Sequence, residues 1–458
     1  MTTHERDDTT VSNGYLPLEP FAHLCPTSVA VLDLEGGLTP APAGGRHGRP
    51  AKDALVLIRL HGEPLGLVHL DRPLCDVSAA DLGQIVLSRC AGAILRHARA
   101  SGCMTPPSGA ADLGAGLGSA ATCAGAQSPP APGSVALIVP TSARRSQLRR
   151  CLASVGQLRG LDFEVIVVNN GPRDAEIDRV VADAAEAGMP VRCVNETRPG
   201  SSVARNRGIA ETRADIVAFT DDDVVLDPDW LRWLIAPFSA ADVGAATGMV
   251  LPLELEAPAQ KRFEQLAGFS RGLTQRSFDL RSHDAERRFL YPYAGGVFGS
   301  GNSMAFRRSS IVALGGFDPA LGAGSRALAG ADIDALSGVV LRGERLVYDP
   351  RSLCWHEHRK DDAELRRQIF NYGVGFTAIL TKAALRDRRF AHSVARSLPM
   401  VVSARRSWRA RTGEANGRLV VADYVRINRS GMLRGPQRYL QSVVWSHKLG
   451  LDRVIAGG

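Results

Sequence analysis

Three consecutive carboxylates, Asp221-Asp222-Asp223, are the residues of this chain best suited to chemistry, and they follow an apolar run of strand character at 216–219. Like charges in a row repel one another, so a chain tolerates them where water solvates them or a cation neutralises them. Hard divalent cations such as Mg²⁺ or Mn²⁺ prefer oxygen ligands and often bridge carboxylates to phosphates. The trio alone leaves two interpretations open: a cation site, or a solvated turn that caps a helix starting near Pro228.

The surrounding pattern predicts the elements that must position this trio. Apolar runs typical of buried strands alternate with helical segments, and this β-α-β-α order predicts a parallel, doubly wound sheet. The predicted strands are Val135–Val139, Phe163–Val168, Val191–Val194 and Ile216–Phe219, and the predicted helices span about 147–158, 175–187 and 202–212.

Polar residues follow three of these strands, at Pro140-Thr141, at Asn169-Asn170 and at the aspartate trio. All three strand ends fall on the sheet edge where open α/β folds bind nucleotides. Neither Gly-x-Gly-x-x-Gly nor Gly-x-x-x-x-Gly-Lys-Ser/Thr follows the first strand, which excludes a dinucleotide fingerprint and a P-loop.

Several further motifs occur in order along the chain. They are Arg198 to Gly208 (RPGSSVARNRG), Gly299 to Arg308 (GSGNSMAFRR), Gly315 to Asp318 (GGFD), Gly330 to Asp334 (GADID) and Cys354 to Arg359 (CWHEHR). Together with the trio, these motifs resemble the family 2 glycosyltransferases of the GT-A fold over about Ser134 to Lys382. The resemblance implies an α/β fold with a mostly parallel, doubly wound sheet of the nucleotide-diphospho-sugar transferase type.

The resemblance also implies roles for individual residues. The nucleotide-sugar donor would be held by Pro140, Thr141, Asn169, Asn170, Arg198, Asn206, Asp221, Asp222, Gly301 and Asn302. A divalent cation, Mn²⁺ or Mg²⁺, would be bound by Asp223, Asp221 and His356, with His358 as the less favoured alternative to His356, and Asp332 would be the general base. The implied reaction is an inverting sugar transfer to a hydroxyl acceptor, which needs a base for the hydroxyl and charge neutralisation for the leaving diphosphate.

Each of these roles has a structural alternative. Asp332 or Asp334 could cap a helix that runs to about Arg342. His356 could be a half-buried histidine on a strand at 353–358, and the glycines from Gly299 could mark a bulged strand rather than an approach to the sugar.

Two positions depart from the family pattern. Ala331 stands before Asp332, where the family usually has Glu, so one acid beside the base is lost. Asn169 stands where the family usually has Asp, and its amide can still accept a hydrogen bond. The loss at Ala331 leaves a second interpretation open: a nucleotide-sugar-binding protein of this fold with lost or weak turnover.

Composition divides the 458 residues into four parts. Residues 1–100 predict a small α+β accessory module with a hairpin around a four-residue loop (61–64) and a helix from Ser78-Ala79-Ala80-Asp81 to about Ala100. A Gly/Ala/Pro-rich linker follows at 101–133, then the glycosyltransferase domain at 134–384 and a basic extension at 385–458. The eight scattered cysteines form no Cys-x-x-Cys pair, so their spacing indicates neither a zinc site nor a disulfide framework.

Charge is concentrated in the C-terminal extension, where 15 Lys/Arg stand against 4 Asp/Glu and the net charge is +11. A basic tail could contact an anionic membrane or could be an ordinary arginine-rich surface. No nucleic-acid motif accompanies the charge, so no nucleic-acid partner is expected. No apolar run is long enough to span a bilayer, and the polar N-terminus does not resemble a secretory signal. We therefore expect a cytoplasmic protein, with membrane association at the cytoplasmic face left open.

Overall fold

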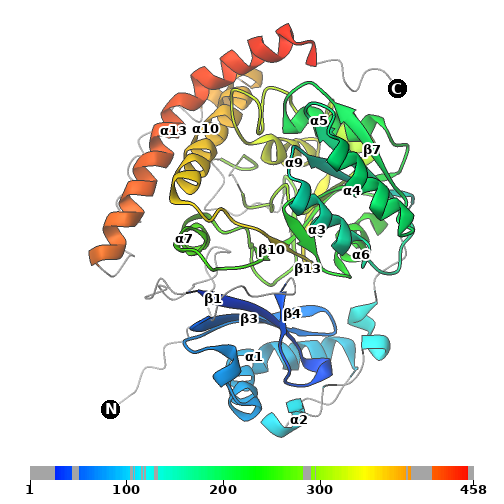
Figure 1. Cartoon of the computed structure of the whole chain (residues 1–458), viewed down its shortest axis with the longest axis vertical. Helices are drawn as coiled ribbons and strands as arrows, with labels where there is room; N and C mark the ends of the chain where they lie inside the picture. Colours follow the sequence, from blue (N-terminus) through cyan, green and yellow to red (C-terminus); the bar gives the residue numbers. More distant parts are fainter. Residues whose placement is uncertain are drawn as a thin grey trace.

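The computed structural model contains a small sheet near the N-terminus, a large mixed sheet with helices on both faces, and two long helices near the C-terminus (Figure 1). It describes residues 26–43, 51–103, 107, 109–114, 117, 120–127, 133–281, 290–293, 296–387, 390–392 and 415–451.

The N-terminal sheet has the order β2-β1-β3-β4, built from β1 (Thr27–Asp33), β2 (Ala41–Pro42), β3 (Asp53–Leu60) and β4 (Glu63–Leu70). Helix α1 (Ala79–Ser101) covers one face of it and begins as predicted, because the Ser78 hydroxyl accepts a hydrogen bond from the Asp81 amide at 3.1 Å. The predicted four-residue hairpin loop is wrong. The loop is the dipeptide His61-Gly62, in which both residues have positive φ, so β4 begins two residues earlier than predicted.

The large sheet has the order β11-β13-β10-β12-β8-β5-β6-β7, and β9 pairs with β13. The four strands predicted to run parallel do so: β5 (Val135–Thr141), β6 (Glu164–Asn170), β7 (Val191–Glu196) and β8 (Ile216–Phe219). The remaining strands run in both directions. They are β9 (Val224–Leu226), β10 (Val243–Pro252), β11 (Arg276–Phe278), β12 (Met304–Arg307) and β13 (Arg345–His356).

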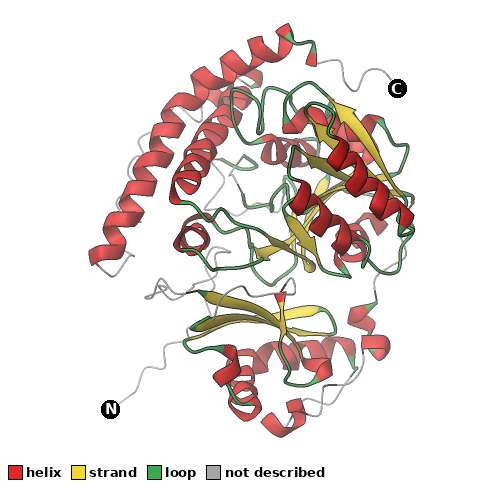
Figure 2. Cartoon of the chain, viewed as in Figure 1, coloured by secondary structure: helices red, strands yellow, loops and turns green. Residues whose placement is uncertain are grey.

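Helices pack on both faces of this sheet, as a doubly wound fold requires (Figure 2). Alternation within β5 shows why: Leu137 and Val139 join the core on one face, and Ile138 joins the core on the other. The first face carries α3 (Arg145–Val155), α4 (Ala175–Glu186) and α6 (Trp230–Ile235), and the second carries α5 (Ser201–Ala210), α8 (Arg308–Ala313) and α9 (Ala331–Leu341). Helix α7 (Pro258–Ala267) packs separately against α10.

Two long helices, α10 (Asp362–Arg386) and α13 (Ala415–Lys448), lie side by side (Figure 1). The axes approach closely because glycines face the neighbouring backbone: a Cβ on Gly373 would clash with the Asn428 carbonyl, and one on Gly431 would clash with the Phe370 carbonyl. In the part of the chain that the structure describes, no helix is long and apolar enough to cross a bilayer.

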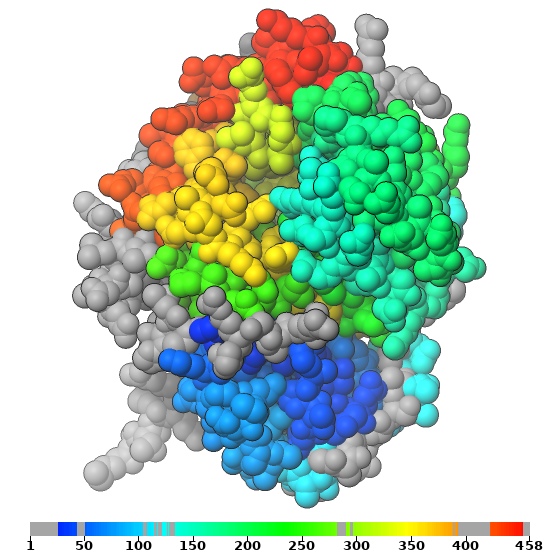
Figure 3. Space-filling model, viewed as in Figure 1, coloured from blue at the N-terminus to red at the C-terminus, as the bar shows by residue number. Residues whose placement is uncertain are grey.

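The N-terminal module lies at one end of the molecule (Figure 3). The face of its sheet opposite α1 packs Val31 and Leu57 against Met249 of β10 and Trp355 of β13. The division of the chain at residues 100, 133 and 384 remains our proposal. Within the segment predicted to be a linker, a short helix α2 (Ala110–Gly114) forms, and Leu113 and Leu117 are buried against the module.

Candidate active site

The aspartate trio lies directly beyond the carboxyl end of β8 and opens into a cavity of about 880 Å³. Ten of the predicted site residues line this cavity: Pro140, Thr141, Asn170, Asp221, Asp222, Asp223, Gly301, Asn302, Asp332 and His356. They come from six separate stretches of the sequence, and the parallel strand order brings the first ones together at one sheet edge.

Three predicted residues do not line the cavity. Asn169 is buried and donates to the Asn195 side chain at 2.8 Å, and Arg198 pairs with Glu196 at 2.7 Å. The Asn206 amide holds the backbone of Phe317 through two hydrogen bonds of 2.8 Å, so it fixes a loop. The structure therefore gives these three side chains positioning contacts and not direct access to the cavity.

The three carboxylates of the trio face different partners. Asp221 accepts from Arg205 at 2.9 Å and from the Asn302 amide at 3.3 Å. Asp222 accepts from the Thr141 hydroxyl at 2.7 Å. Arg144 donates to Asp223 at 2.6 Å and to Asp222 at 3.2 Å, so two arginines neutralise much of the local negative charge.

These different surroundings shift the pKa values of the three carboxyl groups in different directions. Burial and the neighbouring Asp223 carboxylate raise the pKa of Asp222 to about 6. Burial also raises the pKa of Asp221, against the opposing charge of Arg205. Burial acts to raise the pKa of Asp223 as well, but the interactions of its carboxylate with His356 and Arg144 outweigh burial and hold that pKa well below its usual range. Asp223 is thus the member of the trio that stays ionised most readily.

Asp223 and His356 form a fitting pair of donors for a divalent cation. The Asp223 Oδ1 atom is buried without a hydrogen-bond partner and lies 3.4 Å from His356 Nε2. The His356 ring is held from behind, because its Nδ1 lies 2.9 Å from His358 Nδ1, and His358 Nε2 contacts Glu264 at 2.6 Å. Oxygen and imidazole donors suit Mn²⁺, whereas Asp221, the third predicted ligand, is directed towards Arg205 and Asn302.

Asp332 stands on the first turn of α9, and its Oδ2 accepts a hydrogen bond from the Gly301 amide at 2.8 Å. Neither acidic residue of this turn caps the helix: Gly330 occupies the N-cap position with φ 98°, and no side chain supplies the cap bond. Asp334 instead pairs with Lys382 at 2.6 Å. The capping interpretation is therefore wrong for both, and Asp332 faces the cavity.

Four arginines that were not among the predicted site residues line the cavity, and two of them, Arg144 and Arg205, contact the aspartate trio. Arg144 follows β5 at the predicted ligand edge, and that position was an available signal. Arg205 lies in the middle of α5, is 7% exposed and stands 5.7 Å from the centre of the Phe317 ring. Its place within the Arg198 to Gly208 motif gave no indication that it would pair with Asp221.

A family model described as "Glycosyltransferase like family 2" matches residues 131–371, more than half of the chain. The chain belongs to this glycosyltransferase family. The GT-A type fold expected from the sequence motifs agrees with this membership.

Curated relatives of this family 2 glycosyltransferase carry glycosyltransferase names. A pre-mycofactocin glycosyltransferase of Mycobacterium tuberculosis is 30% identical over 228 residues, which cover 49% of the chain and 43% of the relative. A glucosyl-dolichyl phosphate glucuronosyltransferase of Haloferax volcanii is 26% identical over 198 residues, which cover 43% of the chain and 59% of the relative. The chain thus spans about half the length of these two relatives.

One similar solved structure is a mannosyltransferase from Pyrobaculum calidifontis in complex with GDP-Man and Mn²⁺. Its TM-score is 0.43 at 19% identity, and the match covers 69% of this chain and 87% of that one.

Proposed function

We propose that this protein is a metal-dependent, inverting glycosyltransferase that moves a sugar from a nucleoside-diphosphate sugar to a hydroxyl acceptor. The observation that carries the proposal is the convergence of Asp223, His356 and Asp332 on one cavity at the nucleotide edge of the sheet. A cation-binding pair and a candidate base are the two functions that such a transfer requires.

Asp223 and His356 would hold Mn²⁺ or Mg²⁺, which when bound would neutralise the diphosphate of the donor and so improve it as a leaving group. Arg205 and Arg144 add fixed positive charge on the same side of the cavity. Guanidinium groups match phosphate oxygens in geometry, so both can exchange a carboxylate partner for the donor diphosphate. Pro140, Thr141 and Asn170 would line the nucleoside part of the site.

Asp332 would take the proton of the acceptor hydroxyl as the new glycosidic bond forms. The Gly301 amide fixes one carboxylate oxygen, and Oδ1 is left for the acceptor. Ala331, the residue before it, is 2% exposed and packs in the apolar core. Its methyl group cannot hydrogen-bond an acceptor, so Asp332 would act without the neighbouring acid that the family usually has.

The alternative, a nucleotide-sugar-binding protein without turnover, is supported by Ala331 alone. Thermal shift with a panel of UDP- and GDP-sugars plus Mn²⁺ tests binding, because a ligand that binds the folded state raises the unfolding temperature. We expect stabilisation by one donor class that needs Mn²⁺ and is lost in Asp223→Ala but kept in Asp162→Asn, an exposed control. Stabilisation without release of nucleoside diphosphate for any acceptor would favour the alternative, and no stabilisation by any donor would contradict both.

The basic C-terminal helix would also give the protein a peripheral contact with anionic membranes. Leu433, Leu440 and Val444 of α13 are exposed, and Arg434 lies exposed among them. An apolar face with flanking arginines is the composition that binds anionic lipid surfaces. Co-sedimentation with vesicles should rise with phosphatidylserine content and fall in Leu433→Ser/Leu440→Ser; binding that ignores both changes would contradict this contact.

A further inference from the structure

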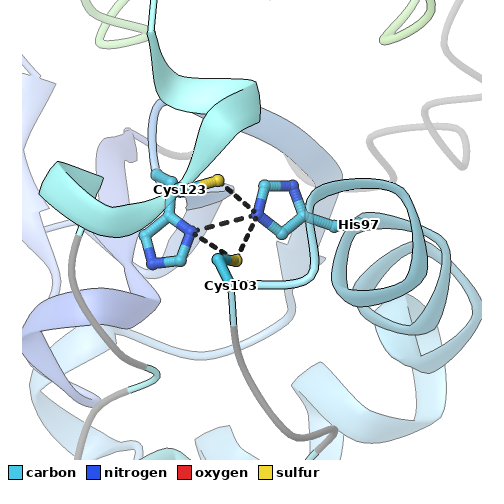
Figure 4. A group of neighbouring side chains, drawn as sticks. His97, Cys103 and Cys123 are labelled. Carbon is cyan, nitrogen blue, oxygen red and sulfur yellow. Dashed lines mark hydrogen bonds between the residues drawn. The ribbon is translucent and has the colours of Figure 1, made fainter.

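A second group of side chains with metal-binding chemistry lies in the N-terminal module, outside the cavity described above. His61, His97, Cys103 and Cys123 each offer one nitrogen or sulfur atom, and these four atoms all lie within 4.8 Å of one another. Figure 4 labels three of the four residues, His97, Cys103 and Cys123. The two histidines and Cys123 are buried, with exposures of 3% or less, and Cys103 is partly buried.

Three sulfur–nitrogen distances in this cluster match the edges of a tetrahedron around a zinc ion, and the two imidazole nitrogens lie slightly closer together than such an edge. Zn–N bonds of about 2.0–2.1 Å and Zn–S bonds of about 2.3 Å place tetrahedral ligand atoms roughly 3.3–3.8 Å apart. Cys103 Sγ lies 3.5 Å from His61 Nδ1 and 3.6 Å from His97 Nε2. Cys123 Sγ lies 3.4 Å from His97 Nε2, and the two imidazole nitrogens are 3.0 Å apart.

In each of the two histidine rings, one nitrogen points into the cluster and the other points away from it. The hydrogen-bond partner of the outer nitrogen determines whether the inner nitrogen carries a lone pair or a hydrogen. His61 Nε2 lies 3.0 Å from the Leu117 carbonyl oxygen, and His97 Nδ1 lies 2.6 Å from a Glu63 carboxylate oxygen. Both partners only accept, so both ring nitrogens must carry hydrogen. In neutral rings, His61 Nδ1 and His97 Nε2 therefore direct lone pairs at each other, an arrangement that a cation between them makes favourable.

We propose that these four residues bind a structural Zn²⁺ ion. Two thiolates and two neutral imidazoles balance the charge of the ion, so the buried site is neutral, and binding releases the two thiol protons to solvent. Sulfur and imidazole donors in a tetrahedral arrangement select zinc among common divalent ions. The carboxylate and carbonyl behind the two rings are the outer partners that zinc-bound histidines usually have.

The site would join segments that are far apart in the sequence. His61 comes from the β3–β4 turn and His97 from near the C-terminal end of α1, whereas Cys103 and Cys123 come from the Gly/Ala-rich segment that follows. The proposed ion thus holds that segment on the module. Two residues after Cys123, the segment also contacts the large sheet. Arg351 of β13 donates a hydrogen bond to the Gly125 carbonyl at 3.3 Å and stacks on the Trp233 ring.

Metal analysis of the purified full chain by mass spectrometry tests the proposal. We expect about one zinc per chain, retained in Cys75→Ser, whose cysteine is exposed and outside the cluster, and in Asp223→Ala of the active site. Cys123→Ser should lose most of the zinc, and Glu63→Ala should weaken zinc affinity by about 10–100-fold. A reduced chain that neither contains nor takes up zinc overturns the proposal, as does zinc that survives Cys123→Ser.

Two measurements on the unmodified chain keep the test decisive if a variant does not fold. Replacement of zinc by Co²⁺ should give the strong visible bands of a tetrahedral ion with a thiolate charge-transfer band. Chelation should make the segment at 101–133 sensitive to limited proteolysis, and added zinc should reverse this. Weak octahedral bands, unchanged proteolysis, or a native Cys103–Cys123 disulfide found by peptide mapping would each overturn the site.

Discussion

The backbone amide of Gly301 donates a hydrogen bond to Asp332 Oδ2 at 2.8 Å, which ties the glycine loop before β12 to the first turn of α9. The contact leaves little space, because a Cβ on Gly301 would lie 3.2 Å from that oxygen and 3.3 Å from Arg205 Nη2. The proposed base is thus positioned by backbone and not by a partner side chain.

Gly301→Ala should therefore displace Asp332 without unfolding the protein. We expect turnover to fall by about 10–100-fold, more than donor affinity does, because small displacements of a catalytic group carry costs of that size. Steady-state kinetics and donor titration measure the two effects separately. Gly36→Ala is the matched control, since a Cβ there meets nothing within 4 Å; equal activity of both variants would contradict the positioning role.

Arg205 and Asp221 should behave as one unit. Arg205→Met leaves a cavity-lining carboxylate without its ion-pair partner, and we expect a loss of about 1–3 kcal/mol in the free energy of unfolding. Adding Asp221→Asn should recover part of that loss, because the unpaired charge is then removed. Denaturant unfolding of both single variants and the double variant measures the coupling, and strictly additive losses would show that the pair is not coupled.

The contact of α13 with α10 should depend on glycine. Gly431→Ala would force its methyl group against the Phe370 carbonyl, and overpacking of this kind costs about 1–3 kcal/mol. We expect a lower unfolding temperature and faster proteolysis within α13. Ser430→Ala, at the exposed neighbouring position, should leave both unchanged; a Gly431→Ala protein as stable as this control would refute the close packing.

The same helix pair should weaken in acid. Hydrogen bonds from Arg366 and Arg426 lower the pKa of Asp423 on α13, and on α10 the hydrogen bonds of Tyr424 and Arg366 outweigh burial and lower the pKa of Asp362. Carboxylates with a lowered folded pKa stabilise the fold above the unfolded pKa of about 3.9, and this stabilisation is lost as the pH falls through the folded pKa. The unfolding temperature should thus fall as the pH is lowered below about 4. This fall should be less steep in the Asp423→Asn variant than in the Asp162→Asn control. If the unfolding temperatures of the two variants fall equally steeply with decreasing pH, these contacts are not the cause of the acid sensitivity.

Continuous apolar runs predicted the first half of the large sheet because β5, β6 and β8 are buried on both faces. Ile216–Phe219 was predicted with the observed bounds, and the aspartates after it lie at the predicted ligand edge. Asn206 could not be placed, because the same amide can contact a ligand or clamp a loop, and only the path of Phe317 decides between them. Arg205 was missed because a helical arginine usually faces solvent.

The cluster of His61, His97, Cys103 and Cys123 could not be predicted from the spacing of these residues along the sequence. Its ligands are separated by 36, 6 and 20 positions, so no short motif signals them. They meet only because the His61-Gly62 turn is tighter than predicted and because Leu113 and Leu117 anchor the following segment. The presence of leucines such as Leu113 and Leu117 in an otherwise Gly/Ala-rich stretch was the available signal.

Release of nucleoside diphosphate, measured with Mn²⁺, the stabilising donor and a panel of hydroxyl acceptors, tests the central claim most directly. Our account predicts that Asp332→Asn binds the donor as the unmodified protein does but releases nucleoside diphosphate about 10²–10⁴-fold more slowly. It also predicts that Asp223→Ala loses release together with Mn²⁺-dependent donor binding. Release by Asp332→Asn at the unmodified rate would contradict the assignment of Asp332 as the base.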